Sequence, residues 1–137
     1  MESIKIVIHT DPRSKKNSMR IVTRGRYPRL LPSAQYEAWR NECLAVINSN
    51  YPQSKIKINY PVNLKIVYYM KTRRKVDITN LHSAVSDMLV DACVIADDNR
   101  DICAAYDGSR VFYDKEDPRC EITITKLDED YKQWKEQ

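Results

Sequence analysis

Glycine is scarce in this chain of 137 residues, which has only Gly25 and Gly108. Neither belongs to a G-x-x-x-x-G-K-[ST] or a G-x-G-x-x-G pattern, so the chain has no glycine-rich loop that could enclose the phosphates of a nucleotide. We therefore expect no nucleotide cofactor.

Cysteine pairs with the spacing of zinc ligands are also missing. The four cysteines, Cys43, Cys93, Cys103 and Cys120, are far apart, and none forms a C-x-x-C pair. A structural zinc site is therefore not expected. Reduced and mostly buried thiols are the simpler interpretation.

No apolar run approaches the roughly 20 residues of a membrane-spanning helix. The first ten residues, MESIKIVIHT, are too short and too alternating for a signal peptide. We expect a cytoplasmic protein without membrane contact. With 42% hydrophobic and 31% charged residues, the composition is ordinary for a globular protein. It predicts one domain over residues 1–127, followed by a polar tail or short helix over 128–137.

Basic residues gather in two segments, although the net charge is only +4. Between Pro12 and Tyr36 there is no acid, and the basic residues are Arg13, Lys15, Lys16, Arg20, Arg24, Arg26 and Arg29. The second cluster is Lys71, Arg73, Arg74 and Lys75. A solvated surface would explain either cluster alone. Together, and next to the acids described below, they favour nucleic acid as a partner.

The hydrophobic pattern predicts an α+β fold, a single small domain with a mixed β-sheet packed against two main helices. Strands are expected near residues 4–8, 62–70 and 120–125. A hairpin is expected from 102–106 and 111–113 around Asp107-Gly108. Residues 13–32 read as a loop, with a short strand at 19–23 and turn signals at Gly25, Pro28 and Pro32. A helix capped by Ser33 is expected to end near residues 48–50.

The second helix, over about residues 80–92, has the clearest pattern. Its apolar residues recur at helical spacing and form one stripe: Leu81, Ala84, Val85, Met88, Leu89 and Ala92. Thr79 or Asn80 is expected to cap its start. Asn80, Asp87 and Asp91 lie on one flank beside the stripe. Asp87 is either exposed to solvent or turned toward a metal ion.

Carboxylates stand at both ends of this helix. Asp77 precedes it and the pair Asp97-Asp98 follows it. Because the chain must reverse to bury the helix, these acids can converge on one point. Carboxylate oxygens are the hard ligands that Mg²⁺ and Mn²⁺ prefer. Such a cation next to basic segments suggests chemistry on a phosphodiester.

These motifs resemble those of the RusA-like Holliday junction resolvases, or crossover junction endodeoxyribonucleases. The motif K-x-D-x-x-N-L begins at Lys75, and an amphipathic helix separates it from Asp97-Asp98. The loop PRSKKNS over 12–18 and the helix start PSAQY over 32–36 also resemble segments of that family. The resemblance covers about residues 4–127 in the same order.

The resemblance implies a homodimer that cuts four-way DNA junctions with Mg²⁺, or Mn²⁺ as a substitute, in a bacterial or phage-infected cell. It implies metal binding by Asp77 and Asp98 and catalytic roles for the neighbouring Asp97 and for Asp87. The residues expected to contact DNA are Lys15, Lys16, Asn17, Arg20, Arg73, Arg74 and Lys75.

The chain departs from the family pattern at two positions. Thr79 stands where the D-x-D-N pattern has its second acid, and Ser83 where the best-known member has a lysine. Thr79 is either a weak metal ligand or only a helix cap, and Asp87 or Asp101 can supply the missing charge. Three functions therefore stay open: a junction endonuclease, a nucleic-acid-binding module with a decayed site, and an interaction protein with an acidic partner.

Overall fold

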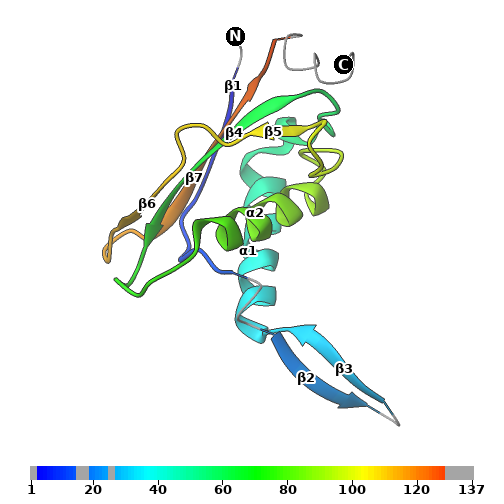
Figure 1. The fold of residues 1–137 in the computed structure, drawn as a ribbon, viewed down its shortest axis with the longest axis vertical. Helices are drawn as coiled ribbons and strands as arrows, with labels where there is room; N and C mark the ends of the chain where they lie inside the picture. Colours follow the sequence, from blue (N-terminus) through cyan, green and yellow to red (C-terminus); the bar gives the residue numbers. More distant parts are fainter. Residues whose placement is uncertain (1–2, 15–18, 25–26, 129–137) are drawn as a thin grey trace.

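Two helices pack on one face of a mixed β-sheet in this computed structural model, which describes residues 3–14, 19–24 and 27–128 (Figure 1). Within these residues the sheet has five strands: β1 (Ser3–Ile8), β7 (Arg119–Lys126), β4 (Val62–Met70), β5 (Cys103–Ala105) and β6 (Arg110–Tyr113). β7 runs antiparallel between β1 and β4, and β5 and β6 both pair parallel with β4. The predicted α+β fold is confirmed. No helix in the described part of the chain has the length and apolar character needed to span a membrane.

The central strand β4 connects the sheet to the helices. Leu64, Ile66 and Tyr68 alternate along it and are completely buried, whereas Lys65 between them is exposed. Alternate residues of a strand point to opposite faces, so the buried set faces the helices. This side of β4 is the centre of the hydrophobic core.

Helix α1 (Ala34–Asn50) begins and ends as the pattern predicts. Ser33 is its N-cap, and Ser33 Oγ accepts a hydrogen bond from the Tyr36 backbone N–H at 3.1 Å. Its buried residues Tyr36, Trp39, Cys43 and Ile47 recur at helical spacing and form one face of the helix. A 3₁₀ turn, η1 (Pro52–Ser54), follows the helix.

The cap predicted for helix α2 (Ile78–Asp91) was wrong. Asp77, and not Thr79 or Asn80, is the N-cap, because Asp77 has extended backbone angles and its carboxylate accepts the Thr79 backbone N–H. Thr79 is already helical. The predicted apolar stripe is confirmed, since its members from Leu81 to Ala92 are all buried.

The predicted hairpin over residues 102–113 was also wrong, since β5 and β6 both pair with β4. Side chains join the segment between them to β4. Asn63 Nδ2 donates to the Asp107 carbonyl at 3.1 Å, and Asn63 Oδ1 accepts the Asp107 N–H at 2.7 Å. Ser109 Oγ accepts the Ile66 N–H at 3.0 Å. Gly108, with φ +88°, provides the turn.

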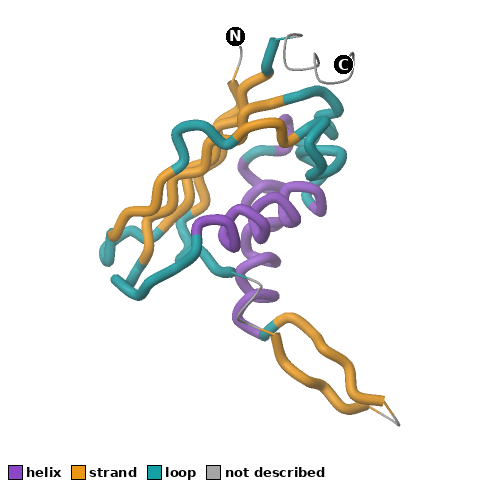
Figure 2. Tube along the Cα trace, in the orientation of Figure 1, coloured by secondary structure: helices purple, strands orange, loops and turns teal. Residues whose placement is uncertain are grey.

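The prediction of a loop with one short strand was wrong for residues 19–32. These residues form two paired strands, apart from the two positions between the strands that the structure does not describe. β2 (Met19–Arg24) and β3 (Tyr27–Pro32) form a separate antiparallel ribbon, which extends from the start of α1 away from the main sheet (Figures 1 and 2). In a two-stranded ribbon each strand has one unpaired side, so Pro28 and Pro32 are tolerated there. The predicted turn at Gly25 lies outside the described residues, as does the predicted C-terminal tail beyond Asp128.

All four cysteines are free thiols, as predicted. Cys43, Cys103 and Cys120 are buried, and Cys93 is half-buried. Burial raises the pKa of Cys120 to about 12, which keeps this thiol protonated and unreactive at neutral pH.

Candidate active site

The chain reverses its direction in a tight turn directly after α2 and then runs back beside that helix. Ala92 is the C-cap, and Cys93 follows it with φ +63°, the left-handed conformation that commonly ends a helix. The Val94 N–H then donates to the Leu89 carbonyl at 3.0 Å. Glycine is the usual residue at such a position, so Cys93 adopts this turn at a conformational cost.

The segment after the reversal is fixed by pairing with Ile58. The Ile58 N–H donates to the Val94 carbonyl, and the Ala96 N–H donates to the Ile58 carbonyl, both at 2.9 Å. Val94 and Ile95 are buried. A short buried segment therefore fixes the position of the acidic pair Asp97-Asp98 that follows it.

Asp97 organises the acidic loop. Its Oδ1 accepts the Asp98 backbone N–H at 2.7 Å, and its Oδ2 accepts Asn99 Nδ2 at 3.3 Å. Asn99 Oδ1 in turn accepts the Asp101 N–H at 2.9 Å. Both carboxylate oxygens of Asp97 thus accept hydrogen bonds from within the loop. These bonds fix the backbone at Asp98, the next residue in the loop.

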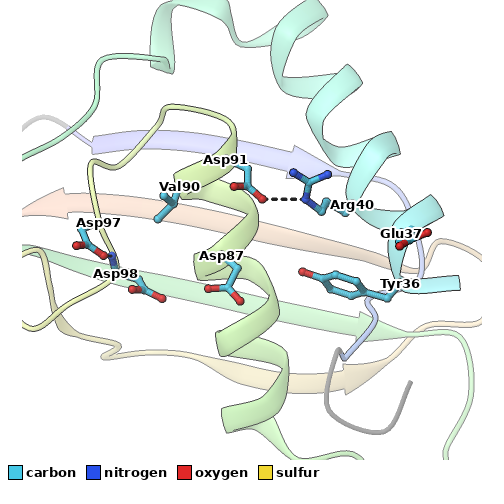
Figure 3. A pocket seen from close by; sticks show the side chains of 8 residues that line it. All are labelled: Tyr36, Glu37, Arg40, Asp87, Val90, Asp91, Asp97 and Asp98. Atoms are coloured by element: carbon cyan, nitrogen blue, oxygen red, sulfur yellow. Dashed lines mark hydrogen bonds and ion pairs between the residues drawn. The ribbon is translucent and has the colours of Figure 1, made fainter. Parts of the chain in front are cut away.

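An acidic cavity of about 400 Å³ lies between the two helices and this loop. Figure 3 shows the carboxylates of Asp87 and Asp98 next to each other, and both line this cavity together with Asp97. The predicted flank of α2 therefore faces the acidic loop at Asp87. The lining residues are Tyr36, Glu37, Arg40, Asp87, Val90, Asp91, Asp97 and Asp98.

The pKa of Asp98 is raised above its ordinary value. Removal of water from around its carboxyl group is the main cause, and hydrogen bonding to Asp87 and Asp97 adds to it. The negative charge of Asp87 raises this pKa further, because a second anion close by disfavours ionisation. The site therefore favours a proton or a cation at Asp98.

A second cavity, of about 310 Å³, lies along the same helix and also includes Asp98. The other lining residues are Thr79, His82, Ser83, Ser86 and Tyr106. The four from α2 occur at positions i, i+3, i+4 and i+7, so they occupy one helix face. That spacing was visible in the sequence, but no role was predicted for His82 or Ser86. Asp98 connects the two cavities.

The structure places Asp77 in a different hollow from Asp98. Asp77 lines a groove of about 600 Å³ that also includes Asn80. Asp77 Oδ1 accepts hydrogen bonds from the Thr79 N–H at 3.1 Å and from Thr79 Oγ1 at 2.7 Å. Thr79 thus contacts Asp77 and lines a cavity with Asp98, whereas of these three cavities, each formed by described residues, Asp77 and Asp98 line different ones.

The groove at Asp77 is also basic. Its three cations, Arg13, Arg74 and Lys75, outnumber its two acids, Asp11 and Asp77, although Arg13 lies 3.6 Å from the Asp11 carboxylate. The groove also lies at the N-terminus of α2, where the helix dipole attracts anions. Of the other predicted DNA contacts, Arg73 lies over the Tyr113 ring at 4.6 Å from its centre. Arg20 belongs to β2. Lys15, Lys16 and Asn17 lie outside the described residues.

The carboxylates partly meet the requirements of a divalent cation. Within residues 3–14, 19–24 and 27–128, no three or more His, Cys, Asp or Glu side chains are grouped so as to hold a metal ion. Mg²⁺, however, usually binds one or two carboxylates and completes its shell with water and substrate phosphates. Asp98 beside Asp87, with a raised Asp98 pKa, fits that requirement.

Comparison with known families matches residues 10–125 to the model described as Endodeoxyribonuclease RusA. The match includes both helices, the acidic loop and every residue that lines the two cavities. No curated protein matches the chain.

Proposed function

Because the chain belongs to the RusA endodeoxyribonuclease family, we propose that it is a divalent-metal-dependent enzyme that resolves four-way DNA junctions by paired cuts in recombination and repair. The family itself implies cleavage of Holliday junctions. The observation that supports metal dependence is that Asp87, Asp97 and Asp98 line one cavity between α1 and α2, with the carboxylates of Asp87 and Asp98 next to each other (Figure 3).

In this proposal Asp98 and Asp87 hold Mg²⁺, or Mn²⁺ in its place. Asp77, which lines the groove at the start of α2, is proposed as the third acid, since Thr79 bonds Asp77 and also lines a cavity with Asp98. A bound ion would lower the pKa of a coordinated water and polarise the scissile phosphate. Asp97 holds the loop through the Asp98 and Asn99 contacts, so its role is to position Asp98.

The basic groove is the proposed path of one DNA strand. Arg13, Arg74 and Lys75 neutralise its phosphates, and the N-terminus of α2 attracts them further. Asp77 and Asn80 line the same groove, so a strand bound there lies next to Thr79. Arg73, Lys15, Lys16, Asn17 and Arg20 are also proposed to contact DNA phosphates.

Paired cuts require two active sites, so the proposal includes a homodimer that works on junctions in the cytoplasm of a bacterial or phage-infected cell. The test compares a labelled four-way junction with a matched linear duplex in Mg²⁺, Mn²⁺ or EDTA. Affinity for any DNA falls steeply with salt, so both substrates are compared at one ionic strength. We expect symmetric nicks on the junction alone, lost in EDTA. Equal cutting of duplex, or cutting in EDTA, would contradict the proposal.

A binding-only function is the second candidate. Thr79 supports it, because this hydroxyl stands where the family pattern has an acid, and no preformed set of three acidic ligands is present among the described residues. This alternative predicts tight junction binding without cuts in Mg²⁺, Mn²⁺ or EDTA.

A further inference from the structure

A hydrogen-bonded aromatic cluster lies beneath the second cavity. Tyr68 Oη and His82 Nδ1 are 2.6 Å apart. The imidazole stacks on the Tyr106 ring, with ring centres 4.6 Å apart and an angle of 14°. Tyr106 Oη in turn lies 3.4 Å from Ser86 Oγ. His82 is therefore held in one orientation by β4 on one side and by Tyr106 on the other.

The cluster also determines which nitrogen of His82 carries the proton. Tyr68 is completely buried, and burial raises the pKa of its phenol far above neutrality, so the O–H is retained. Nδ1 of His82 is the hydrogen-bond partner of that hydroxyl among the described residues, so the buried O–H has an acceptor only when Nδ1 accepts from it. We therefore assign Nδ1 as the acceptor. Burial lowers the pKa of His82, so the ring is neutral. A neutral imidazole with an accepting Nδ1 has its N–H at Nε2.

Part of the His82 side chain faces the second cavity. Tyr68 does not line the cavity, whereas His82 does, together with Thr79, Ser86 and Asp98. Within the described part of the chain, the hydrogen bond to Tyr68 is the only one that His82 makes. Because Tyr68 occupies Nδ1, Nε2 is the nitrogen that His82 can offer to a ligand in the cavity that Asp98 also lines.

We propose that His82 is a further catalytic residue, whose Nε2–H donates a hydrogen bond to a non-bridging oxygen of the scissile phosphate held beside Asp98. This inference rests on the proposed function. The proton stays on the imidazole, and the bond stabilises negative charge that develops on the phosphate oxygens. A neutral donor held in advance by Tyr68 and Tyr106 needs no rearrangement at the moment of reaction. Tyr68 acts through His82 and is a positioning residue.

Kinetics of junction cleavage test the donor directly. We expect His82→Ala to lower kcat by about a hundredfold, as loss of one fixed donor does in other sites, with junction binding unchanged within about twofold. His82→Gln keeps an N–H at similar reach and should recover part of the rate. His9→Gln is the matched control, because His9 is exposed and bonds Asp117 at 2.9 Å. Thermal unfolding confirms that each variant is folded. A folded His82→Ala variant that cleaves at the wild-type rate overturns the inference.

A second measurement needs no cleavage. The chain has two histidines, so ¹⁵N spectra of the imidazoles resolve His82 from His9. We expect the Nε2–H tautomer at His82, lost in Tyr68→Phe, and a shift of Nε2 when a four-way junction is added with Ca²⁺ in place of Mg²⁺. The His9 signal should not move.

The two readouts separate the two proposals. If the wild type cuts no junction, the proposed function fails, and the spectra alone decide the inference about His82. A His82 signal that is unchanged by the junction overturns it, whereas a shifted Nε2 signal supports phosphate contact in a binding protein.

Discussion

Arg40 of α1 and Asp91 of α2 form an ion pair at the rim of the acidic cavity, with Nε 2.8 Å from Oδ2. The pair joins the two helices and neutralises one of the four aspartates that line the cavity (Figure 3). Both side chains are partly exposed, so their attraction is weakened by water.

We expect this ion pair to contribute about 0.5 kcal/mol to the free energy of unfolding, as partly exposed pairs do. Denaturant unfolding of Arg40→Gln, Asp91→Asn and the double variant measures the coupling energy directly. A coupling energy indistinguishable from zero would show that the pair does not join the helices energetically.

Asp98→Asn should abolish junction cleavage and yet stabilise the fold at pH 7. The pKa of Asp98 is raised in the folded state, by loss of water first and by Asp87 and Asp97 next. In the unfolded chain an aspartate has a pKa of about 3.9. Below that pH the Asp98 carboxyl is neutral in both the folded and the unfolded state, so it does not change the free energy of unfolding. As the pH rises through the folded-state pKa, the wild type loses stability that the amide variant keeps.

Asp98 is exposed, so water weakens the electrostatic effect. We expect Asp98→Asn to raise the free energy of unfolding at pH 7 by about 0.5 kcal/mol, or Tm by roughly 2 °C. Melting curves at pH 3 and pH 7 measure it, and the difference should be present at pH 7 and vanish at pH 3. Asp107→Asn is the control, since the bonds of Asn63 reach only the Asp107 backbone. A wild type more stable than Asp98→Asn at pH 7 would contradict the electrostatic argument.

Two substitutions at Asp77 separate its role as a helix cap from its role in the site. Asparagine caps helices as well as aspartate does, whereas alanine leaves the Thr79 N–H without its acceptor. We expect Asp77→Asn to unfold within about 0.3 kcal/mol of the wild type and Asp77→Ala to lose about 1 kcal/mol. Both should fail to cut junctions. Robust cleavage by Asp77→Asn would remove Asp77 from the proposed metal site.

Thr79→Asp should strengthen metal binding. Thr79 lines the cavity with Asp98 and contacts Asp77, so a carboxylate there adds an anionic oxygen between the two acids. We expect Mg²⁺ to bind roughly tenfold more tightly, since ligand charge tunes affinity for hard cations. Isothermal titration calorimetry of both proteins measures the change. Equal Mg²⁺ affinities would show that residue 79 does not face the ion.

Sequence patterns predicted those parts of the fold that depend on local periodicity. The stripe of α2 and the alternation of β4 are such cases, and the flank position of Asp87 beside the stripe followed from helix geometry alone. The cap of α2 was missed because Asp77, Thr79 and Asn80 are all good cap residues within four positions. Only backbone angles distinguish them.

Contacts between distant segments explain the other errors. Residues 102–113 were predicted to form a hairpin, whereas they pair with β4 instead. The sequence could not show this, because Asn63, which accepts the Asp107 N–H, lies 44 residues earlier in the chain. Asp91 was grouped with Asp87, and no sequence pattern pairs it with Arg40, 51 residues away. The orientation of His82 likewise depends on Tyr68 and Tyr106, which belong to other elements.

Two short strands, β5 and β6, share the sheet edge beside β4, and this limits the addition of a strand from another molecule at that edge. A strand added from another protein needs an unbroken row of backbone donors and acceptors. On this side the row is interrupted at residues 106–109, where the chain turns to bond the side chain of Asn63. On the opposite edge, β1 runs from Ser3 to Ile8, but Tyr51 Oη accepts the Val7 N–H at 3.2 Å and donates to the Val7 carbonyl at 3.4 Å. A strand added from another protein therefore meets an interruption at either edge of the sheet, at residues 106–109 on one side and at Tyr51 on the other.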